Sequence, residues 1–309
     1  MSAANHETEP YDTDLLAWPK GQIDAVFDTD TFNEIDDQFA LVYALLSGER
    51  INLQAVYAAP FHNNRSSGPG DGMEKSYREI QRVLERVPTN KPPATLKGAQ
   101  AWLEKGEVPP SNPAVEDLIA RARARSANDG RLYVIAVGAI TNVAAALLRA
   151  PDIRDRIVVL WLGAHPLTWH TAREFNLRGD PVAARVLFDT SVPTVLFPCR
   201  NVAEAIKTTP AEINLFVRGK GRIGDYLAEI FNDYHGMDKL AASKAIWDLA
   251  PFAWIMDEDW VDSHLVTSPV LNEDLTWSHP GGRHHIREII YIRRDPVFRD
   301  LFQKLARYQ

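Results

Sequence analysis

Four aspartates crowded behind an apolar run constrain this chain more than any other feature. Residues 23–27 form the expected strand, and Asp28, Asp30, Asp36 and Asp37 follow it within ten positions. At an effective dielectric near 20, two unit charges about 4 Å apart repel by roughly 4 kcal/mol. A bound cation offsets such repulsion. Because the ligands are hard oxygens with no adjacent histidine or cysteine, the cluster favours calcium or magnesium over zinc.

Short apolar strands and helical stretches alternate through the first two thirds of the chain. This alternation is typical of a parallel sheet in an α/β fold. The expected strands are residues 23–27, 53–59, 132–137, 157–162 and 192–197. From about residue 200 we expect helices at 210–217, 223–234, 245–254 and 297–308, with two late strands at 265–271 and 286–292. The prediction is an open, mostly parallel sheet with flanking helices and a helical C-terminal part.

The chain carries no sign of a second domain or of a membrane segment. Residues 1–21 are polar and acidic and predict a flexible N-terminal lead-in, and residues 22–309 predict a single domain. No run approaches the roughly 18 apolar residues of a membrane span, so we expect a cytoplasmic protein. One cysteine, Cys199, excludes an internal disulfide framework.

The overall charge argues against nucleic acid as a partner. The chain has 34 Lys and Arg and 41 Asp and Glu, which gives a formal net charge of -7. It contains no long cluster of basic residues. Proteins that bind nucleic acid usually present a basic surface. We therefore expect a small-molecule partner and contact with neither nucleic acid nor membrane.

Polar residues follow several of the predicted strands. In an open parallel sheet, ligands bind beyond the carboxyl ends of the strands. The aspartates follow the first strand, Val137 ends the third, and Glu174 and Asn176 lie in the loop after the fourth. These segments are distant in sequence but share one edge of the sheet, which predicts a single site there.

The same residues resemble the inosine-uridine-preferring nucleoside hydrolase family. The Asp28-Thr29-Asp30 and Asp36-Asp37 pairs match its N-terminal motif, and residues 137–142 (VGAITN) are similar to its TGPLTN stretch. Residues 174–184 resemble its AEFNxxxDPEAA segment, and residues 73–75 its LEK. Trp247-Asp248 stands where the family has its last metal aspartate. The resemblance spans about residues 23–305 and implies a Rossmann-like fold and a homodimer or homotetramer.

The resemblance implies hydrolysis of the N-glycosidic bond of ribonucleosides to free base and ribose. Calcium would be held by Asp30, Asp37, the main-chain carbonyl of Val137 and Asp248. Asp30 would be the general base that activates a water molecule. Asp28 would lie behind these residues and orient them.

The resemblance also implies the contacts to substrate. Asp36 would accept from the ribose 2′-hydroxyl, while Asn176 and Glu174 would hold the 3′ and 5′ side. Thr168 stands near the position of a ribose-binding asparagine. Trp247 stands where the purine-preferring branch has a tryptophan, so it either stacks on a purine or packs in the core.

Other positions depart from the family pattern. Residues 31–35 make the first motif two residues longer, and Asn33 or Glu34 either contacts the ribose or only caps the loop. Ala59-Pro60 replaces Gly-Asn after the second strand, and Asn63 or Asn64 could replace the missing amide. Further candidates for the base pocket are Phe61, His62, Trp169, Tyr234 and His235.

Three alternatives stay open on the residues alone. A strand ending in Asp-x-Asp also resembles haloacid-dehalogenase-type phosphatases, although Phe32 stands where those enzymes have Thr or Val. A calcium-dependent nucleoside or sugar-binding protein could use the same acids without hydrolysis. An enzyme of this fold could also act on a different ribosyl compound.

Overall fold

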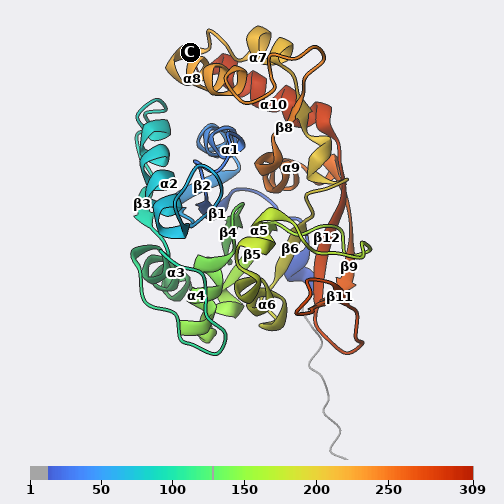
Figure 1. The fold of residues 1–309 in the computed structure, drawn as a ribbon. Helices are drawn as coiled ribbons and strands as arrows, with labels where there is room; N and C mark the ends of the chain where they lie inside the picture. The colour runs from blue at the N-terminus through green and yellow to red at the C-terminus, as the bar shows by residue number, and fades with distance from the viewer. Residues whose placement is uncertain (1–12, 127–128, 309) are drawn as a thin grey trace, which may run out of the picture.

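An eight-stranded sheet runs through the molecule in the computed structural model, which describes residues 13–126 and 129–308 (Figure 1). The strand order is β3 (Ala94–Lys97), β2 (Ile51–Ala58), β1 (Ile23–Thr29), β4 (Leu132–Ala136), β5 (Ile157–Leu162), β6 (Thr194–Phe197), β12 (His285–Ile292) and β9 (Val261–Thr267). All neighbouring pairs are parallel except β12 and β9. The chain therefore has the predicted open, mostly parallel sheet.

Helices cover both faces of this sheet, as Figure 1 shows. One face packs against α1 (Asp36–Leu45), α2 (Pro69–Leu84) and α9 (Ala250–Met256), and the other against α3 (Pro113–Ala124), α4 (Thr141–Arg149) and α6 (Pro181–Asp189). The strands are apolar on both sides. On β5, Leu160 and Leu162 belong to the first core, whereas Val159 and Trp161 belong to the second. Two-sided burial explains the continuous apolar runs in the sequence.

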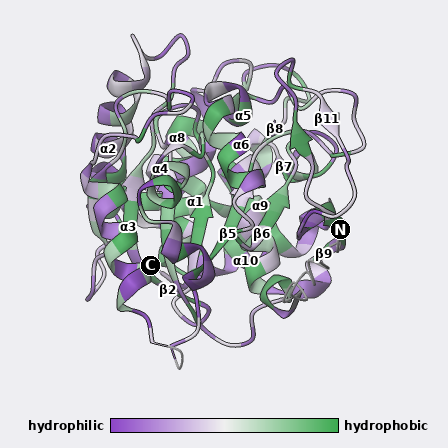
Figure 2. Ribbon diagram, turned by 90° about the horizontal axis from the view of Figure 1, so that it is seen from below, coloured by the Kyte–Doolittle hydropathy of each residue, from purple (hydrophilic) through white to green (hydrophobic). Residues whose placement is uncertain are grey.

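The remaining elements surround this framework. They are helices α5 (Phe175–Gly179), α7 (Pro210–Phe216), α8 (Gly221–Asn232) and α10 (Arg294–Arg307), the short strands β7 (Lys207–Thr208), β8 (Lys244–Ala245), β10 (Val270–Leu271) and β11 (Trp277–Ser278), and the 3-10 helices η1 (Thr13–Leu16), η2 (Pro151–Arg156), η3 (Ala203–Ala205), η4 (Trp247–Leu249) and η5 (Glu258–Trp260). In Figure 2 the most hydrophobic segments are the strands at the centre. Within the described residues, none of the helices has the length and apolar character that crossing a membrane requires.

Several details of the predicted secondary structure were wrong. The strand expected at 265–271 is divided into β9, which begins at Val261, and β10, which pairs with β11 in a separate sheet. The helix expected at 245–254 is divided into β8, η4 and α9, because Pro251 lies at the start of α9 and a longer helix would place it in the interior. Asp248 therefore lies on a 3-10 turn. The edge strand β3 was missed, since it has only four residues and they are largely half-buried or exposed.

The predicted lead-in has two parts. Residues 1–12 lie outside the described residues. Residues 13–16 form η1, Leu16 is buried, and the Trp18 indole donates a hydrogen bond to the Trp254 carbonyl (2.7 Å). The described part of this segment is thus attached to the sheet and to α9.

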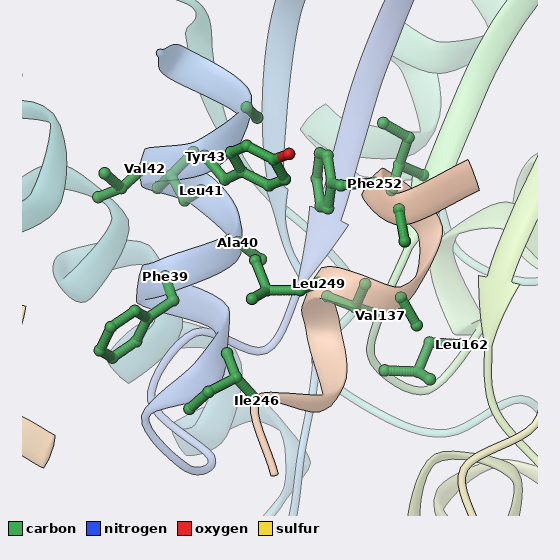
Figure 3. Close-up of a cluster of buried hydrophobic side chains, with 14 of the residues drawn as sticks. Phe39, Ala40, Leu41, Val42, Tyr43, Val137, Leu162, Ile246, Leu249 and Phe252 are labelled. Atoms are coloured by element: carbon green, nitrogen blue, oxygen red, sulfur yellow. The ribbon is translucent and has the colours of Figure 1, made fainter. Parts of the chain in front are cut away.

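Aromatic packing fixes α1 and α9 around the end of β1. Phe27 on β1 meets Phe252 edge-on at 5.5 Å, and Phe252 lies 6.1 Å from Tyr43 on α1. Figure 3 shows Ala40 and Leu249 facing each other below these rings, near the labelled side chain of Val137. This apolar wedge holds the first turn of α1 close to η4.

Candidate active site

The strand order contains a point at which the chain changes direction. From β1 the chain proceeds through β2 to β3 on one side, and from β4 through β5 to β6 on the other. A crevice opens beyond the carboxyl ends of the strands at such a point. Asp30 directly follows β1 there, and Val137 directly follows β4.

One cavity of about 240 Å³ lies in this crevice. It is lined by Asp30, Asn33, Glu34, Asp36, Asp37, Val137, Leu162, His165, Arg173, Glu174, Phe175, Asn176, Cys199, Arg200, Trp247 and Asp248. The residues assigned to catalysis, metal or ribose all line it except Asp28, which was expected behind the others, and Thr168. None of the further candidates for the base pocket lines it: Phe61 and His62 line a neighbouring cavity, Trp169 lies with Thr168, and Tyr234 and His235 line neither. The structure places Thr168 at another cavity, with Trp169 and Trp277, so its predicted ribose contact is not supported.

Three carboxylates form the tightest acidic group in this cavity. Asp36, Asp37 and Asp248 each offer an oxygen within 4.8 Å of the others, and all three are buried. Thr29 donates a hydrogen bond to Asp37 (2.5 Å), and the Trp247 amide donates one to Asp36 (3.1 Å). The first turn of α1 and the η4 turn therefore bring together residues that are more than 200 positions apart.

Asp30 lies beside this group and is 2% exposed. Within the described residues, its Oδ2 atom has no hydrogen-bond partner. Gly138 packs against it, because a Cβ at that position would lie 3.2 Å from the Asp30 carboxyl carbon. Asp30 is thus held at the floor of the cavity with one oxygen free for a ligand.

Burial and mutual repulsion raise the pKa values of these acids. Burial raises the pKa of Asp37 to about 7 and that of Asp36 to about 6, although Lys244 acts against the rise at Asp36. Burial and then the neighbouring carboxylates hold the pKa values of Asp30 and Asp248 well above the ordinary range. Without a cation, the cluster resists full ionisation.

Asp28 lies behind the cavity, fully buried. Its Oδ2 accepts a hydrogen bond from the Asn142 side chain (2.7 Å), and burial raises its pKa to about 7. The Asn142 oxygen in turn accepts from the Ala99 amide (2.8 Å). Asn142 therefore connects β1 to the loop after β3.

Replacing Asn142 with alanine should destabilise the fold by about 3 kcal/mol. The Asp28 carboxyl group and the Ala99 amide would both lose a buried partner, at roughly 1–3 kcal/mol each. Urea unfolding at neutral pH measures the loss. Asn112→Ala is the matched control, because it removes only the N-cap of α3, at about 1 kcal/mol. A loss no larger than the control's would contradict this role of Asn142.

Asn176 and Glu174 sit at the start of α5. The Asn176 amide group donates to the carbonyls of Val137 (2.8 Å) and Leu162 (3.0 Å), so it ties the ends of β4 and β5 together. The Glu174 carboxylate caps α5 by accepting from the backbone amides of Asn176, Leu177 and Ala164. Ala164 adopts a left-handed conformation (φ 63°), which directs its amide to Glu174.

Comparison with known proteins identifies the family. The profile of the inosine-uridine preferring nucleoside hydrolases matches residues 25–285. The chain belongs to this family. It is 28% identical to the pyrimidine-specific ribonucleoside hydrolase RihA of Klebsiella pneumoniae over 314 residues, which cover 88% of this chain and 96% of RihA.

Solved structures of nucleoside hydrolases share the fold. A plant nucleoside hydrolase, PpNRh1, superposes with a TM-score of 0.73 at 18% identity and covers 92% of this chain and 99% of its own. The purine-preferring ribonucleoside hydrolase of Gardnerella vaginalis gives a TM-score of 0.72 at 18% identity, with 92% and 98% covered. The predicted family, fold class and enzyme class are confirmed: this is a ribonucleoside hydrolase, an N-glycosidase. The match leaves no support for the phosphatase alternative.

The acidic cluster fits the metal-dependent chemistry of nucleoside hydrolases. Asp36, Asp37 and Asp248 supply hard oxygen ligands, and the Asp30 Oδ2 atom lacks a partner among the described side chains. Only hard cations suit such a donor set. The structure groups Asp36 with Asp37 and Asp248, whereas the sequence had assigned Asp36 to the ribose alone.

The extended 31–35 loop of this nucleoside hydrolase is held by side chains from outside the motif. The Asn63 amide donates to the Asn33 side chain (2.6 Å), and Arg65 stacks on Phe32 and donates to the Glu34 carbonyl (2.9 Å). Asn63, one of the two expected substitutes for the missing family asparagine, therefore contacts the loop.

Lys244 is a part of the site that sequence reasoning missed. Its side chain is buried, pairs with Glu34, and lies 3.8 Å from Asp36. The ring of Tyr234 lies 4.7 Å from its Nζ. Its position three residues before Trp247 was the available signal. Lys244 couples the extended loop to the acidic cluster.

Three basic residues of the cavity were also missed: His165, Arg173 and Arg200. His165 and Arg200 each stand three positions after a strand, β5 and β6 respectively. The rule that residues after parallel strands line the site would have found both.

A second cavity of about 240 Å³ adjoins the first, since Asp30 and Phe175 line both. The other residues that line it are Pro60, Phe61, His62, Trp102, Ala139, Arg178 and Gly179. Asp30 therefore stands between an acidic chamber and an aromatic one.

Proposed function

We propose that this chain hydrolyses the N-glycosidic bond of purine ribonucleosides, with calcium in the acidic cluster and Asp30 as the general base. The observation that supports this best is the single cavity at the β1–β4 switch point. It collects Asp30, Asp36, Asp37, Asp248 and Asn176 from four separate segments. The reaction is inferred from the family, and the roles of the residues are inferred from their positions in this cavity.

The proposed metal ligands are Asp37 and Asp248, together with Asp30 and the Val137 carbonyl. Asp36 lies near enough to join them. Calcium accommodates six to eight oxygen ligands in a flexible shell, which suits a site that also takes ribose hydroxyls. When bound, the ion would neutralise the carboxylates and acidify a water molecule.

The protein side chains carry the proposed steps. Asp30 takes a proton from the attacking water, since it lines the cavity and its Oδ2 atom has no partner among the described residues. Asp36 accepts from the ribose 2′-hydroxyl, and Asn176 holds the 3′ side through its amide oxygen, because its NH₂ group is used by two carbonyls. The negative surroundings stabilise positive charge that develops on the sugar as the C1′–N bond breaks. The water oxygen joins C1′ as the C1′–N bond breaks, the departing base takes a proton from solvent, and Asp30 returns the proton of the water to solvent.

Trp247 is the proposed purine contact. Its side chain is half-buried, lines the cavity and also packs against the core. An indole stacks on a purine but does not donate a proton as a general acid near neutral pH. The relatives include both purine-preferring and pyrimidine-specific enzymes, so the substrate preference rests on this residue. A cytoplasmic location and a homodimer or homotetramer belong to the same proposal.

A nucleoside panel tests the function. Purified protein with calcium is incubated with inosine, adenosine, guanosine, uridine and cytidine, and released reducing sugar is measured. We expect release from the purines at least about tenfold faster than from the pyrimidines, and loss of that ratio in Trp247→Leu, because stacking contributes about 1–3 kcal/mol. Release from pyrimidines alone would refute the purine preference. No release from any nucleoside, with calcium bound, would favour the binding-protein alternative.

A further inference from the structure

The chemistry of the site changes in order along the edge of the sheet. Residues after β2, Phe61 and His62, line the aromatic cavity with Trp102. The acids follow β1 at the centre. His165 follows β5 and Arg200 follows β6 at the far end of the acidic cavity. A ligand laid across this edge meets aromatic rings first, then carboxylates, then cations.

The cationic end is made by His165, Arg173 and Arg200, a group that we call the basic end. His165 contacts the backbone of Arg173, and burial, followed by the charge of Arg200, lowers the pKa of His165. All three side chains line the cavity although the whole chain is acidic. Their grouping at one end therefore runs against the average charge of the protein.

The side chains of the basic end retain donors for a ligand. Arg173 donates from Nη2 to the Asp274 carbonyl (3.0 Å), and Arg200 meets Glu204 at 3.4 Å while its side chain stays 57% exposed. A guanidinium group has five N–H donors, so each arginine has donors beyond these contacts. In the described part of the chain, the His165 Nδ1 atom is buried without a partner.

Few uncharged groups or free acceptors at this end are available to bind a 5′-hydroxyl. Thr168 lines a different cavity, and the Glu174 carboxylate already accepts from three backbone amides. The groups with spare donors are the cations of the basic end. Paired guanidinium groups match the geometry and charge of a phosphoryl group.

We propose that the basic end binds a phosphoryl group on O5′ of the substrate, so that the chain acts on ribosyl compounds phosphorylated at O5′. The inference rests on the proposed function: with the ribose diol at Asp36, Asp37 and Asp248 and the base between Trp247 and the aromatic cavity, C5′ is directed toward the residues after β5 and β6. Water adds to C1′ as the C1′–N bond breaks, so a nucleoside 5′-monophosphate gives the free base and ribose 5-phosphate, whereas a 5′-diphosphate compound gives the free base and a ribose that still carries the whole diphosphate linkage on O5′. The phosphoryl group belongs either to a nucleoside 5′-monophosphate or to a 5′-diphosphate linkage.

Substrate comparison and direct binding test this subsite together. The rates with inosine, inosine 5′-monophosphate and ADP-ribose are compared as kcat/KM in the presence of calcium. Binding of ribose and ribose 5-phosphate is measured by titration calorimetry. We expect at least a tenfold preference for one of the phosphorylated substrates, and about tenfold tighter binding of ribose 5-phosphate, since hydrogen bonds to charged groups contribute roughly that factor. Preference for inosine 5′-monophosphate or for ADP-ribose identifies the source of the phosphoryl group.

Variants locate the effect. Arg200→Ala and Arg173→Ala should each lower the ratio of phosphorylated to unphosphorylated kcat/KM about tenfold. Arg178→Ala removes the same charge from the aromatic cavity. It should change the individual rates but keep the ratio of phosphorylated to unphosphorylated kcat/KM within about twofold of the wild-type ratio. An equal fall in Arg178→Ala would overturn the assignment to the basic end.

The proposal and the underlying function can fail separately. If inosine is hydrolysed but neither phosphorylated compound is preferred, and ribose 5-phosphate binds no tighter than ribose, the phosphoryl subsite is refuted and the hydrolase stands. If nothing is hydrolysed but ribose 5-phosphate binds tighter than ribose, and Arg200→Ala removes that difference, the subsite stands and the hydrolase fails.

Discussion

Replacing Asp30 with asparagine should lower kcat by about 10²- to 10⁴-fold, the range that a general base contributes. The amide has nearly the same shape as the carboxylic acid but does not accept a proton from water in this pH range. Asp30 is 2% exposed, faces both cavities and packs against Gly138, so a residue of the same size should keep the floor intact. The measurement is initial-rate kinetics with the best nucleoside.

A second aspartate-to-asparagine change controls for charge and folding. Asp155 lies before β5, at the opposite edge of the sheet, and its side chain is 72% exposed. Asp155→Asn should keep kcat within about twofold, as expected for a surface substitution. Calcium binding to Asp30→Asn is followed by calorimetry, so that loss of the metal is separated from loss of the base. An Asp30→Asn enzyme that retains a tenth of the wild-type kcat with calcium bound would exclude Asp30 as the base.

The sheet and the acidic cluster followed from local sequence patterns. Buried parallel strands need apolar residues on both faces, so β1, β4, β5 and β6 were visible as continuous runs. The position of Asp28 and Asp30 after β1, and of Val137 after β4, then predicted a shared edge. Family motifs brought in Asp248, which lies more than 200 residues away.

Features that depend on tertiary contacts could not be predicted from the sequence. The position of Lys244 near Trp247 placed it close to the site, but it did not reveal the pairing with Glu34, because that partner lies in a loop near the other end of the chain. Thr168 was assigned from the resemblance, as the family's asparagine before the Glu-Phe-Asn stretch, but in this loop, where Ala164 has a left-handed conformation, His165 lines the cavity and Thr168 lines another one. Spacing within a loop does not determine direction when one residue has an unusual backbone conformation.

Calcium should stabilise this protein more at pH 8 than at pH 5. Burial raises the pKa of Asp36 to about 6 and that of Asp37 to about 7, above the ordinary value of 3.8. Between about pH 4 and 7 the native state without metal therefore binds more protons than the unfolded state. Its stability falls as pH rises through that window, because unfolding then allows these acids to ionise freely.

The cation reverses this dependence, since it binds the ionised carboxylates and displaces their protons. At pH 8, calcium at about 100 times its dissociation constant should add about 2.7 kcal/mol, which is roughly 5 °C in Tm for a chain of this size. At pH 5 the same calcium concentration should give less than about half of that increase, because protons compete for Asp36 and Asp37. Scanning calorimetry with and without calcium at both pH values measures the difference.

Asp248→Asn should abolish the increase in stability that calcium gives, and Asp155→Asn should retain it. An increase of equal size at both pH values would mean that calcium binds elsewhere, since only the buried acids couple cation binding to proton release in this range.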